Sequence, residues 1–100
     1  MTMTMTSYIG LIDGKAGAYG VAFPDLPGCT AMGATVELAF ANARDALRDW
    51  VEVTLSKGTT VPAPRTIEEL VAADQETSEA VGEGAEYRSI PLVRKTSHPA

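Results

Sequence analysis

Short hydrophobic runs, separated by polar and turn residues, occupy the first third of the chain, and with a period of two their side chains divide between two sides, as Ile9 and Leu11 do from Tyr8 and Ile12. Residues 8–12 form one such run, which stops at Asp13 and Gly14, a dipeptide typical of turns between strands. A second run covers residues 19–23, and a third, shorter run covers residues 29–34. Because alternation places every second side chain on the same face, these runs predict three strands in an antiparallel meander.

The hydrophobic period lengthens to that of a helix after Thr35. Apolar residues recur at helical spacing from Val36 to Val51, and charged residues occupy the opposite side. Thr35 has the side chain of a helix N-cap, and Gly58 follows Lys57 as a stop signal. The pattern predicts one long helix from Val36 to Lys57 that covers a face of the sheet. The residues that we expect in the core are Val21, Phe23, Phe40, Ala43, Leu47 and Trp50.

The C-terminal third contains a second helix, a polar segment and a last strand. Thr66 and Glu69 form a capping box, which predicts a short helix. The acidic, glycine-containing segment 74–86 has few residues to bury, so we expect a mobile loop there. Residues 87–93 follow as a strand. Pro91 cannot donate a backbone hydrogen bond, which places this strand at an edge of the sheet.

These elements predict an α+β fold in the order βββααβ, with both helices on one side of the sheet. One hundred residues, 45% of them hydrophobic, are enough for a single core. We expect one domain over residues 8–93, a flexible leader over residues 1–7 and a flexible tail over residues 94–100.

The composition argues against several classes of function. A net charge of -5 disfavours broad nucleic-acid binding, which relies on clustered lysine and arginine, and suits a basic partner. Cys29 is the only cysteine and His98 the only histidine, too few ligands for an ordinary structural zinc site. No apolar run approaches the roughly 20 residues of a membrane span, and the first residues do not read as a signal peptide. We expect a cytoplasmic protein without a metal or other cofactor.

The stretch FPDLPGC, Phe23 to Cys29, ends the second strand with two prolines and a glycine. Such residues near a strand end usually build a bend, inside which Asp25 accepts amide hydrogen bonds. Cys29 then serves as a small core side chain. The alternative is that the same rigid turn presents Asp25 to a binding partner.

This stretch and its surroundings resemble the HicB antitoxin family. Members have a strand that ends in Phe-Pro-Asp-Leu-Pro-Gly-Cys, then Gly-x-Thr before a helix rich in Glu, Ala and Asn, and later x-Pro-x-Pro. The matching residues are Tyr19, Val21, Phe23 to Cys29, Gly33, Thr35, Glu37, Ala39, Asn42, Ala43, Pro62 and Pro64. The resemblance covers about residues 8–93, which is most of the chain.

The resemblance implies a partial ribonuclease-H-like fold and an antitoxin. Its partner is then a HicA-like toxin, a small basic protein of double-stranded-RNA-binding fold that cleaves mRNA. The chain departs from the family at Leu38, where a second acid usually stands. Many members also carry a C-terminal DNA-binding segment, but only RKTSHPA follows Val93, so we expect no direct DNA binding from this chain.

The partner-binding residues in this hypothesis form the rigid turn, because a preorganised surface lowers the ordering cost of binding. They are Phe23, Pro24, Asp25, Leu26, Pro27 and Gly28. Incomplete cover of the sheet further predicts a homodimer, or a tetramer built from dimers.

Two alternative functions stay open. The first is a solitary HicB-like binding or regulatory module. The second is a metal-dependent nuclease that uses the carboxylates of Asp13, Asp25 and Glu37. The nuclease is disfavoured because Asp13 belongs to a turn signal and Glu37 to a helix start, so we expect no enzymatic activity.

Overall fold

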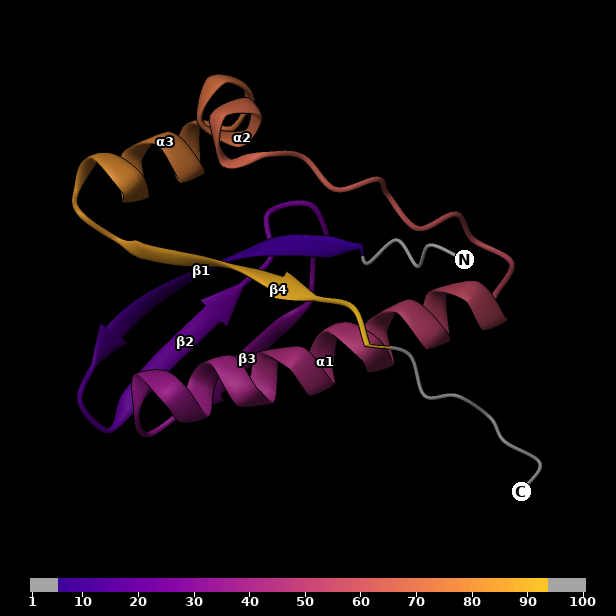
Figure 1. Ribbon diagram of the computed structural model, residues 1–100, viewed down its shortest axis with the longest axis horizontal. Coiled ribbons are helices and arrows are strands. Elements are labelled where there is room, and N and C mark those ends of the chain that lie inside the picture. Colours follow the sequence, from indigo (N-terminus) through magenta and orange to yellow (C-terminus); the bar gives the residue numbers. More distant parts are fainter. Residues whose placement is uncertain (1–5, 94–100) are drawn as a thin grey trace, which may run out of the picture.

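A computed structural model describes residues 6–93, and its elements follow the predicted order with one additional helix. The elements are β1 (Ser7–Lys15), β2 (Ala18–Ala22), β3 (Thr30–Gly33), α1 (Val36–Ser56), α2 (Ile67–Ala73), α3 (Gln75–Gly82) and β4 (Glu86–Pro91). The four strands form one antiparallel sheet in the order β3-β2-β1-β4 (Figure 1). The predicted α+β fold, with its meander, long helix and edge strand, is confirmed.

Alternation along the strands sorts the side chains onto two faces of the sheet. Tyr8 and Ile12 of β1 lie on the first face with Val21 of β2, and all three are almost fully buried. On this face β3 comes so close to α1 that a side chain at Gly33 would clash with the backbone of Ala39. The main core therefore lies between the first face of the sheet and α1.

α1 begins and ends where its capping residues predict. Thr35 Oγ1 accepts the backbone N–H of Leu38 at 3.0 Å. The helix ends before Gly58, whose φ of +73° lies in the left-handed region that favours glycine. Of the residues expected in the core, only Trp50 differs, because it is half-buried and packs against the margin of the core. The buried stripe of α1 consists of Ala39, Phe40, Ala43, Leu47 and Val51.

The segment expected to be a mobile loop contains the helix α3, so the prediction of a loop was wrong. Asp74 caps α3, since its Oδ2 accepts the backbone N–H of Thr77 at 3.3 Å and the Thr77 hydroxyl at 2.5 Å. Thr77 is fully buried. Its hydrogen bonds with Asp74 thus hold the start of α3, a helix whose sequence has no apolar stripe. α2 has the predicted capping box between Thr66 and Glu69.

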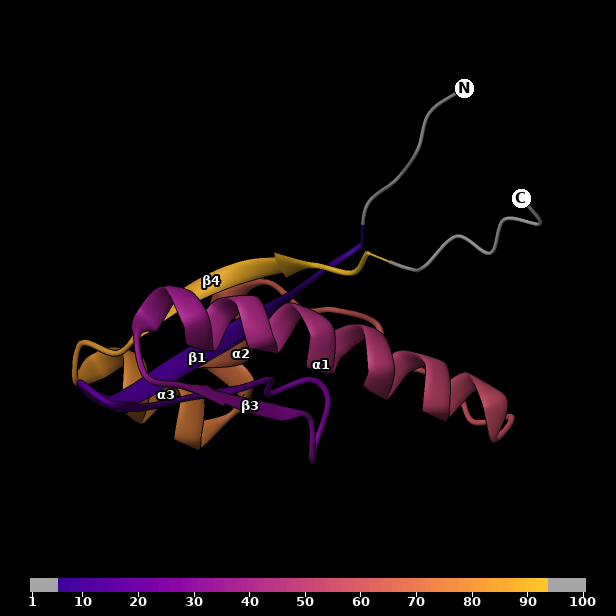
Figure 2. The same cartoon turned by 90° about the horizontal axis from the view of Figure 1, so that it is seen from below.

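The helices lie on both sides of the sheet, which corrects the prediction that they share one side. α1 packs on the first face, and α2 and α3 lie beyond the second face, reached through the connector of residues 57–66 (Figures 1 and 2). Over β1 the second face is partly covered, and Ile9 and Leu11 are half-buried. Over β2 and β3 it is open, because Ala22 is exposed and Met32 is 66% exposed.

β4 lies at one edge of the sheet, as Pro91 predicts, and pairs antiparallel with β1. The carbonyl of Thr6 accepts the backbone N–H of Leu92 at 2.8 Å, so the sheet includes residues just before the expected domain start. The remaining residues of the expected leader and tail lie outside the described residues. In the described part of the chain, no helix is both long and apolar enough to cross a membrane.

Candidate functional site

Backbone hydrogen bonds fix the turn between Phe23 and Cys29. The N–H of Leu26 donates to the carbonyl of Phe23 at 3.0 Å, and the N–H of Cys29 donates to the carbonyl of Leu26 at 2.9 Å. The N–H of Phe23 donates back to the carbonyl of Cys29 at 3.3 Å, which closes the loop. Gly28 has a φ of +88°, so a side chain at this position is strained. The prolines and the glycine therefore build a defined double bend.

Asp25 points inward and joins the turn to the connector. Its side chain is 4% exposed, and its Oδ1 accepts the Arg65 Nε–H at 2.7 Å. Its Oδ2 accepts the backbone N–H of Arg65 at 2.8 Å. The partner of Asp25 is thus 40 residues away rather than inside the turn. The sequence reasoning missed Arg65, although the position of this arginine directly after x-Pro-x-Pro was a usable signal.

A second tie holds the connector against β1. The hydroxyl of Tyr8 donates to the carbonyl of Pro62 at 2.6 Å. Burial and the nearby negative charge of Asp25 raise the pKa of Tyr8, so this hydroxyl stays protonated and available as a donor. The two ties together set the path along which the chain reaches α2.

The structure divides the six predicted site residues by exposure. Phe23, Asp25 and Leu26 are buried, so they hold the turn and offer little surface to a partner. Pro24 is half-buried, whereas Pro27 and Gly28 are exposed at the tip. Partner binding at this turn stays a prediction. The residues of the turn that a partner can contact directly are Pro24, Pro27 and the exposed backbone of Gly28.

Two hollows flank the tip of the turn. The first, of about 770 Å³, lies between the turn and the C-terminal half of α1, and we call it the helix groove. Its wall includes Asp49, Trp50, Val53 and Lys57. The second, of about 690 Å³, lies between the turn, the second face of the sheet and α3, and we call it the sheet hollow. Its wall includes Leu11, Asp13, Gly20, Ala22, Met32 and Glu76.

Cys29 borders both hollows but is itself buried. Burial raises the pKa of its thiol to about 11. The thiol is therefore protonated at neutral pH and a weak nucleophile. Its place is that of a small core side chain, as the sequence predicts.

The three carboxylates of the nuclease alternative do not form a shared site. Asp25 is bound to Arg65, and Glu37 Oε2 accepts a hydrogen bond from Arg88 Nη2 at 3.0 Å. The hydrogen bond and positive charge of Arg88 lower the pKa of Glu37. Asp13 lies apart on the exposed end of β1. Among residues 6–93 no group of three histidine, cysteine or acidic side chains is placed to hold a metal ion.

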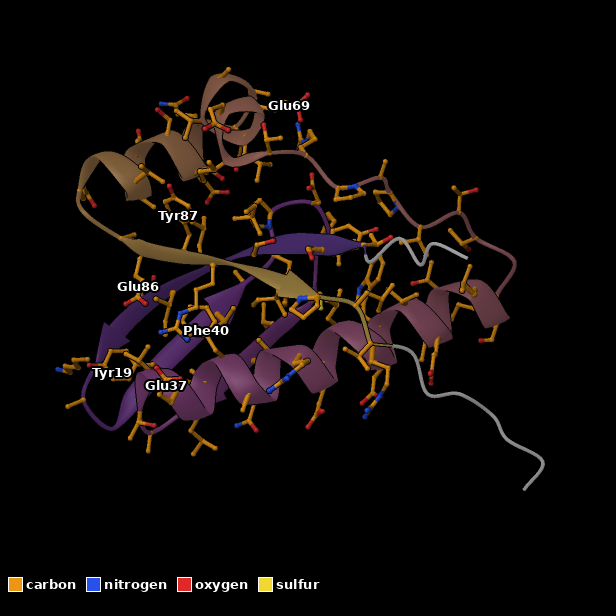
Figure 3. All side chains as sticks on the ribbon, viewed as in Figure 1. Tyr19, Glu37, Phe40, Glu69, Glu86 and Tyr87 are labelled. Atoms are coloured by element: carbon orange, nitrogen blue, oxygen red, sulfur yellow. The ribbon has the colours of Figure 1, made fainter. Side chains whose placement is uncertain are left out.

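Arg88 instead ties β4 to the start of α1. Its guanidinium carbon lies 4.2 Å from the centre of the Phe40 ring, and its Nη2 lies 3.2 Å from Glu86 Oε2. Figure 3 shows Glu86, Glu37 and Phe40 on the α1 side of β4, while Tyr87 points to the side of α3. The contacts of Arg88 therefore hold β4 against α1, and they do not involve the second face of the sheet.

Comparisons with known proteins find one family and several solved structures. Residues 8–85 match the family described as the HicB_like antitoxin of bacterial toxin-antitoxin systems. The N-terminal domain of the Burkholderia pseudomallei antitoxin HicB is 30% identical, with a TM-score of 0.66, over 85% of this chain and 95% of that one. The longer Burkholderia pseudomallei HicB structure is 29% identical, with a TM-score of 0.68, over 95% of this chain and 76% of that one.

A further similar structure is the HicA3 and HicB3 toxin-antitoxin complex. The matched chain is 22% identical, with a TM-score of 0.66, over 85% of this chain and 95% of that one. At this identity the likeness shows the fold alone. The comparison with curated proteins finds no match.

Proposed function

The chain belongs to the HicB-like antitoxin family, and from that premise we propose that it binds and neutralises a HicA-type, mRNA-cleaving toxin. The observation that carries the proposal is the family match, which spans residues 8–85 and so includes the turn, α1 and both small helices. The solved complex of HicA3 with HicB3, which has the same fold, supports a toxin as the partner.

In this proposal the turn of Phe23–Gly28 is part of the toxin-binding surface. The buried Phe23, Asp25 and Leu26 hold the shape of the turn. The exposed Pro27 and Gly28 contact the toxin. A backbone fixed by prolines and by the tie to Arg65 loses little conformational freedom on binding, which favours affinity.

The charge distribution supports a basic partner. Residues 66–86 contain no lysine or arginine, and they carry Glu68, Glu69, Asp74, Glu76, Glu79, Glu83 and Glu86. An acidic surface accelerates its encounter with a basic protein through complementary long-range fields. We infer that the protein acts by binding rather than by catalysis, and that it works in the cytoplasm, where its buried thiol stays reduced.

We also propose that residues 8–93 form one domain that assembles into a homodimer, or into a tetramer built from two dimers. The support is the outer edge of β4, which has no neighbouring strand within the described residues. Unpaired edges offer backbone donors and acceptors to a second copy.

The test of the proposed function is co-expression with a HicA-type toxin, taken from the neighbouring reading frame if that frame encodes a small basic protein. We expect mRNA cleavage by that protein to stop when wild-type chain is present at equal or higher folded concentration. Pro27→Arg places a positive charge on the tip and should weaken protection about tenfold or more, because like charges meet at the interface. Ala16→Arg is the matched control, since Ala16 is exposed at the opposite end of the β1–β2 hairpin.

Continued cleavage with the wild-type chain would overturn the antitoxin proposal and favour a solitary binding module. Full protection by Pro27→Arg would remove the turn from the interface and leave the function intact. RNA degradation by the purified chain with magnesium, lost in Asp25→Asn, would instead establish the nuclease alternative.

A further inference from the structure

The second face of the sheet is apolar and open over β2 and β3. Met32 is 66% exposed, Ala22 is exposed, and Gly20 between them adds no side chain. Leu11 forms the floor of the sheet hollow beside them and is half-buried. Tyr87 of β4 pairs with Leu11 and is 41% exposed on the same side. Exposed apolar side chains gathered on one face of a sheet usually mark a contact with another molecule.

The rim of the sheet hollow is acidic. Asp13, Asp74 and Glu76 line it, and Glu83 shares the adjoining depression with Asp13. None of the ion pairs formed among residues 6–93 includes any of these four acids. Within that part of the chain, no lysine or arginine lines the hollow. Asp74 is engaged as the N-cap of α3, so the acids of the rim that lack a local partner among the described residues are Asp13, Glu76 and Glu83.

The helix groove differs in charge. It has one acid, Asp49, and one base, Lys57, on its wall, and Arg48 Nε lies 3.5 Å from Asp49 Oδ1. These charges largely cancel, so the groove has little preference for a basic partner. Of the two hollows beside the turn, the sheet hollow is the one whose charge matches a basic toxin.

We propose that the sheet hollow is the docking surface for a basic amphipathic helix of the toxin, an inference that rests on the proposed function. The apolar side of that helix packs on Leu11, Ala22 and Met32, and its lysine or arginine side chains meet the acidic rim. Pro24 and Pro27 of the turn line the same hollow, so the turn forms one end of this surface.

A helix fits this surface better than an added β-strand does. Asn42 of α1 donates its side-chain N–H to the carbonyl of Met32 at 2.8 Å. A backbone acceptor on the edge strand β3 is thereby already used, while the side chains of the second face stay free. Recognition through side chains in a groove is the mode by which amphipathic helices bind.

Gly20 gives a variant that fills the hollow with little strain. A Cβ added there meets no atom nearer than 3.8 Å, the distance to Asp13 Oδ1, and its φ is not positive. Gly20→Phe should therefore fold and occupy the space that the partner needs. Asp13→Lys reverses one uncompensated charge on the rim. The matched controls are Val53→Trp and Asp49→Lys, which make the same kinds of change in the helix groove.

The first measurement uses a synthetic amphipathic helix of leucine and lysine, titrated into the folded chain and followed by amide chemical shifts. We expect shifts at Leu11, Gly20 and Ala22 but not at Trp50 or Val53. The affinity should fall about tenfold in Gly20→Phe and in Asp13→Lys and stay unchanged in both controls. A peptide with glutamate in place of lysine should not bind. Absence of binding at about 1 mM peptide, or shifts centred on Trp50, would overturn the proposal.

The second measurement repeats the toxin co-expression with the same four variants. Loss of protection in Gly20→Phe and Asp13→Lys, with protection kept in both controls, supports the docking surface. Full protection by Gly20→Phe overturns it and leaves the antitoxin function standing. If the wild-type chain itself gives no protection, the proposed function fails, and the peptide titration alone decides whether the hollow binds basic helices.

Discussion

A single carboxylate, that of Asp25, joins two segments of the chain that are far apart in sequence. Removing it leaves the backbone N–H of Arg65 without its acceptor and frees the connector on the side of α2. We expect Asp25→Ala to lower the free energy of unfolding by about 1 to 3 kcal/mol, the usual cost of a lost, largely buried hydrogen-bonding partner. Arg65 is 41% exposed and can be hydrated, which keeps the loss below that of a deeply buried ion pair.

Urea unfolding monitored by Trp50 fluorescence measures this loss. Asp13→Ala is the control, because Asp13 is an exposed carboxylate and its removal should change stability by less than about 0.5 kcal/mol. Equal midpoints for the two variants would show that the tie between Asp25 and Arg65 does not hold the fold.

The buried thiol of Cys29 makes stability depend on alkaline pH. Its folded pKa is raised from 9.0 to about 11, so the folded state keeps a proton that the unfolded state loses. The resulting stability, at most about 2 to 3 kcal/mol, is fully present below pH 9 and is lost as the pH rises through 11. The raised pKa of Tyr8 acts in the same direction.

Chemical denaturation between neutral pH and pH 11 checks this dependence. Cys29→Ala should show a shallower decline of stability above pH 9 than the wild-type chain, whatever its stability at neutral pH. Parallel pH curves for the two proteins would contradict the assignment. In the native wild type, a thiol reagent should react slowly at neutral pH and rapidly after unfolding.

Residue-scale predictions from sequence succeed where local geometry decides and fail where a distant partner does. The bend of Phe23–Cys29 and the cap at Thr35 follow from prolines, glycine and a hydroxyl within a few positions. The inward direction of Asp25 depends on Arg65, and the margin position of Trp50 depends on how α1 is rotated against the sheet. Neither fact is encoded near the residue concerned.

At the scale of elements, α3 depends on its N-cap more than on an apolar stripe. Asp74 supplies the acceptor for both the amide and the hydroxyl of Thr77. We expect Asp74→Ala to lower stability by about 1 kcal/mol, the typical value of a lost N-cap. Amide hydrogen exchange should accelerate within residues 75–82 and stay unchanged in α1.

A control for this variant is Glu79→Ala, which keeps the cap and removes only an exposed contact with Gln75. Similar exchange rates in Asp74→Ala and in the wild type would mean that the cap does not hold α3. The acids and glycines that dominate the composition of residues 74–86 predict a loop. The N-cap outweighs this composition here because Thr77, three residues after the capping Asp74, is fully buried and bonded to it.

At the scale of the molecule, the sequence predicts which segments form the sheet and the long helix better than it predicts the face of the sheet on which each helix lies. The meander and the long helix follow from two clear periods, 2 and about 3.6. The crossing of the chain to the second face depends on the connector and its ties to Tyr8 and Asp25, which no local pattern reveals. The sheet hollow exists because of that crossing, so no sequence pattern could have predicted it.

Assembly is tested at this scale. We expect light scattering at tens of micromolar, a range in which a stable interface is occupied, to give a dimer or a tetramer. Ser89→Pro removes a backbone donor at an exposed position of β4, so we choose it to weaken pairing between copies. Arg88 is left unchanged because it contacts Phe40 of α1. A monomeric wild-type chain would remove the assembly proposal and leave the docking surface unaffected.

The tie between Asp25 and Arg65 also orders events during synthesis. Translation delivers Asp25 to the outside of the ribosome 40 residues before its partner. Until then the carboxylate has no Arg65 donor, and it stays hydrated because burying it unpaired is costly. We expect the backbone bonds inside the turn to form first, and the inward placement of the Asp25 carboxylate to follow once Arg65 has emerged. A chain interrupted before Arg65 would contain three of the four strands and the bend itself, but no partner for the Asp25 carboxylate.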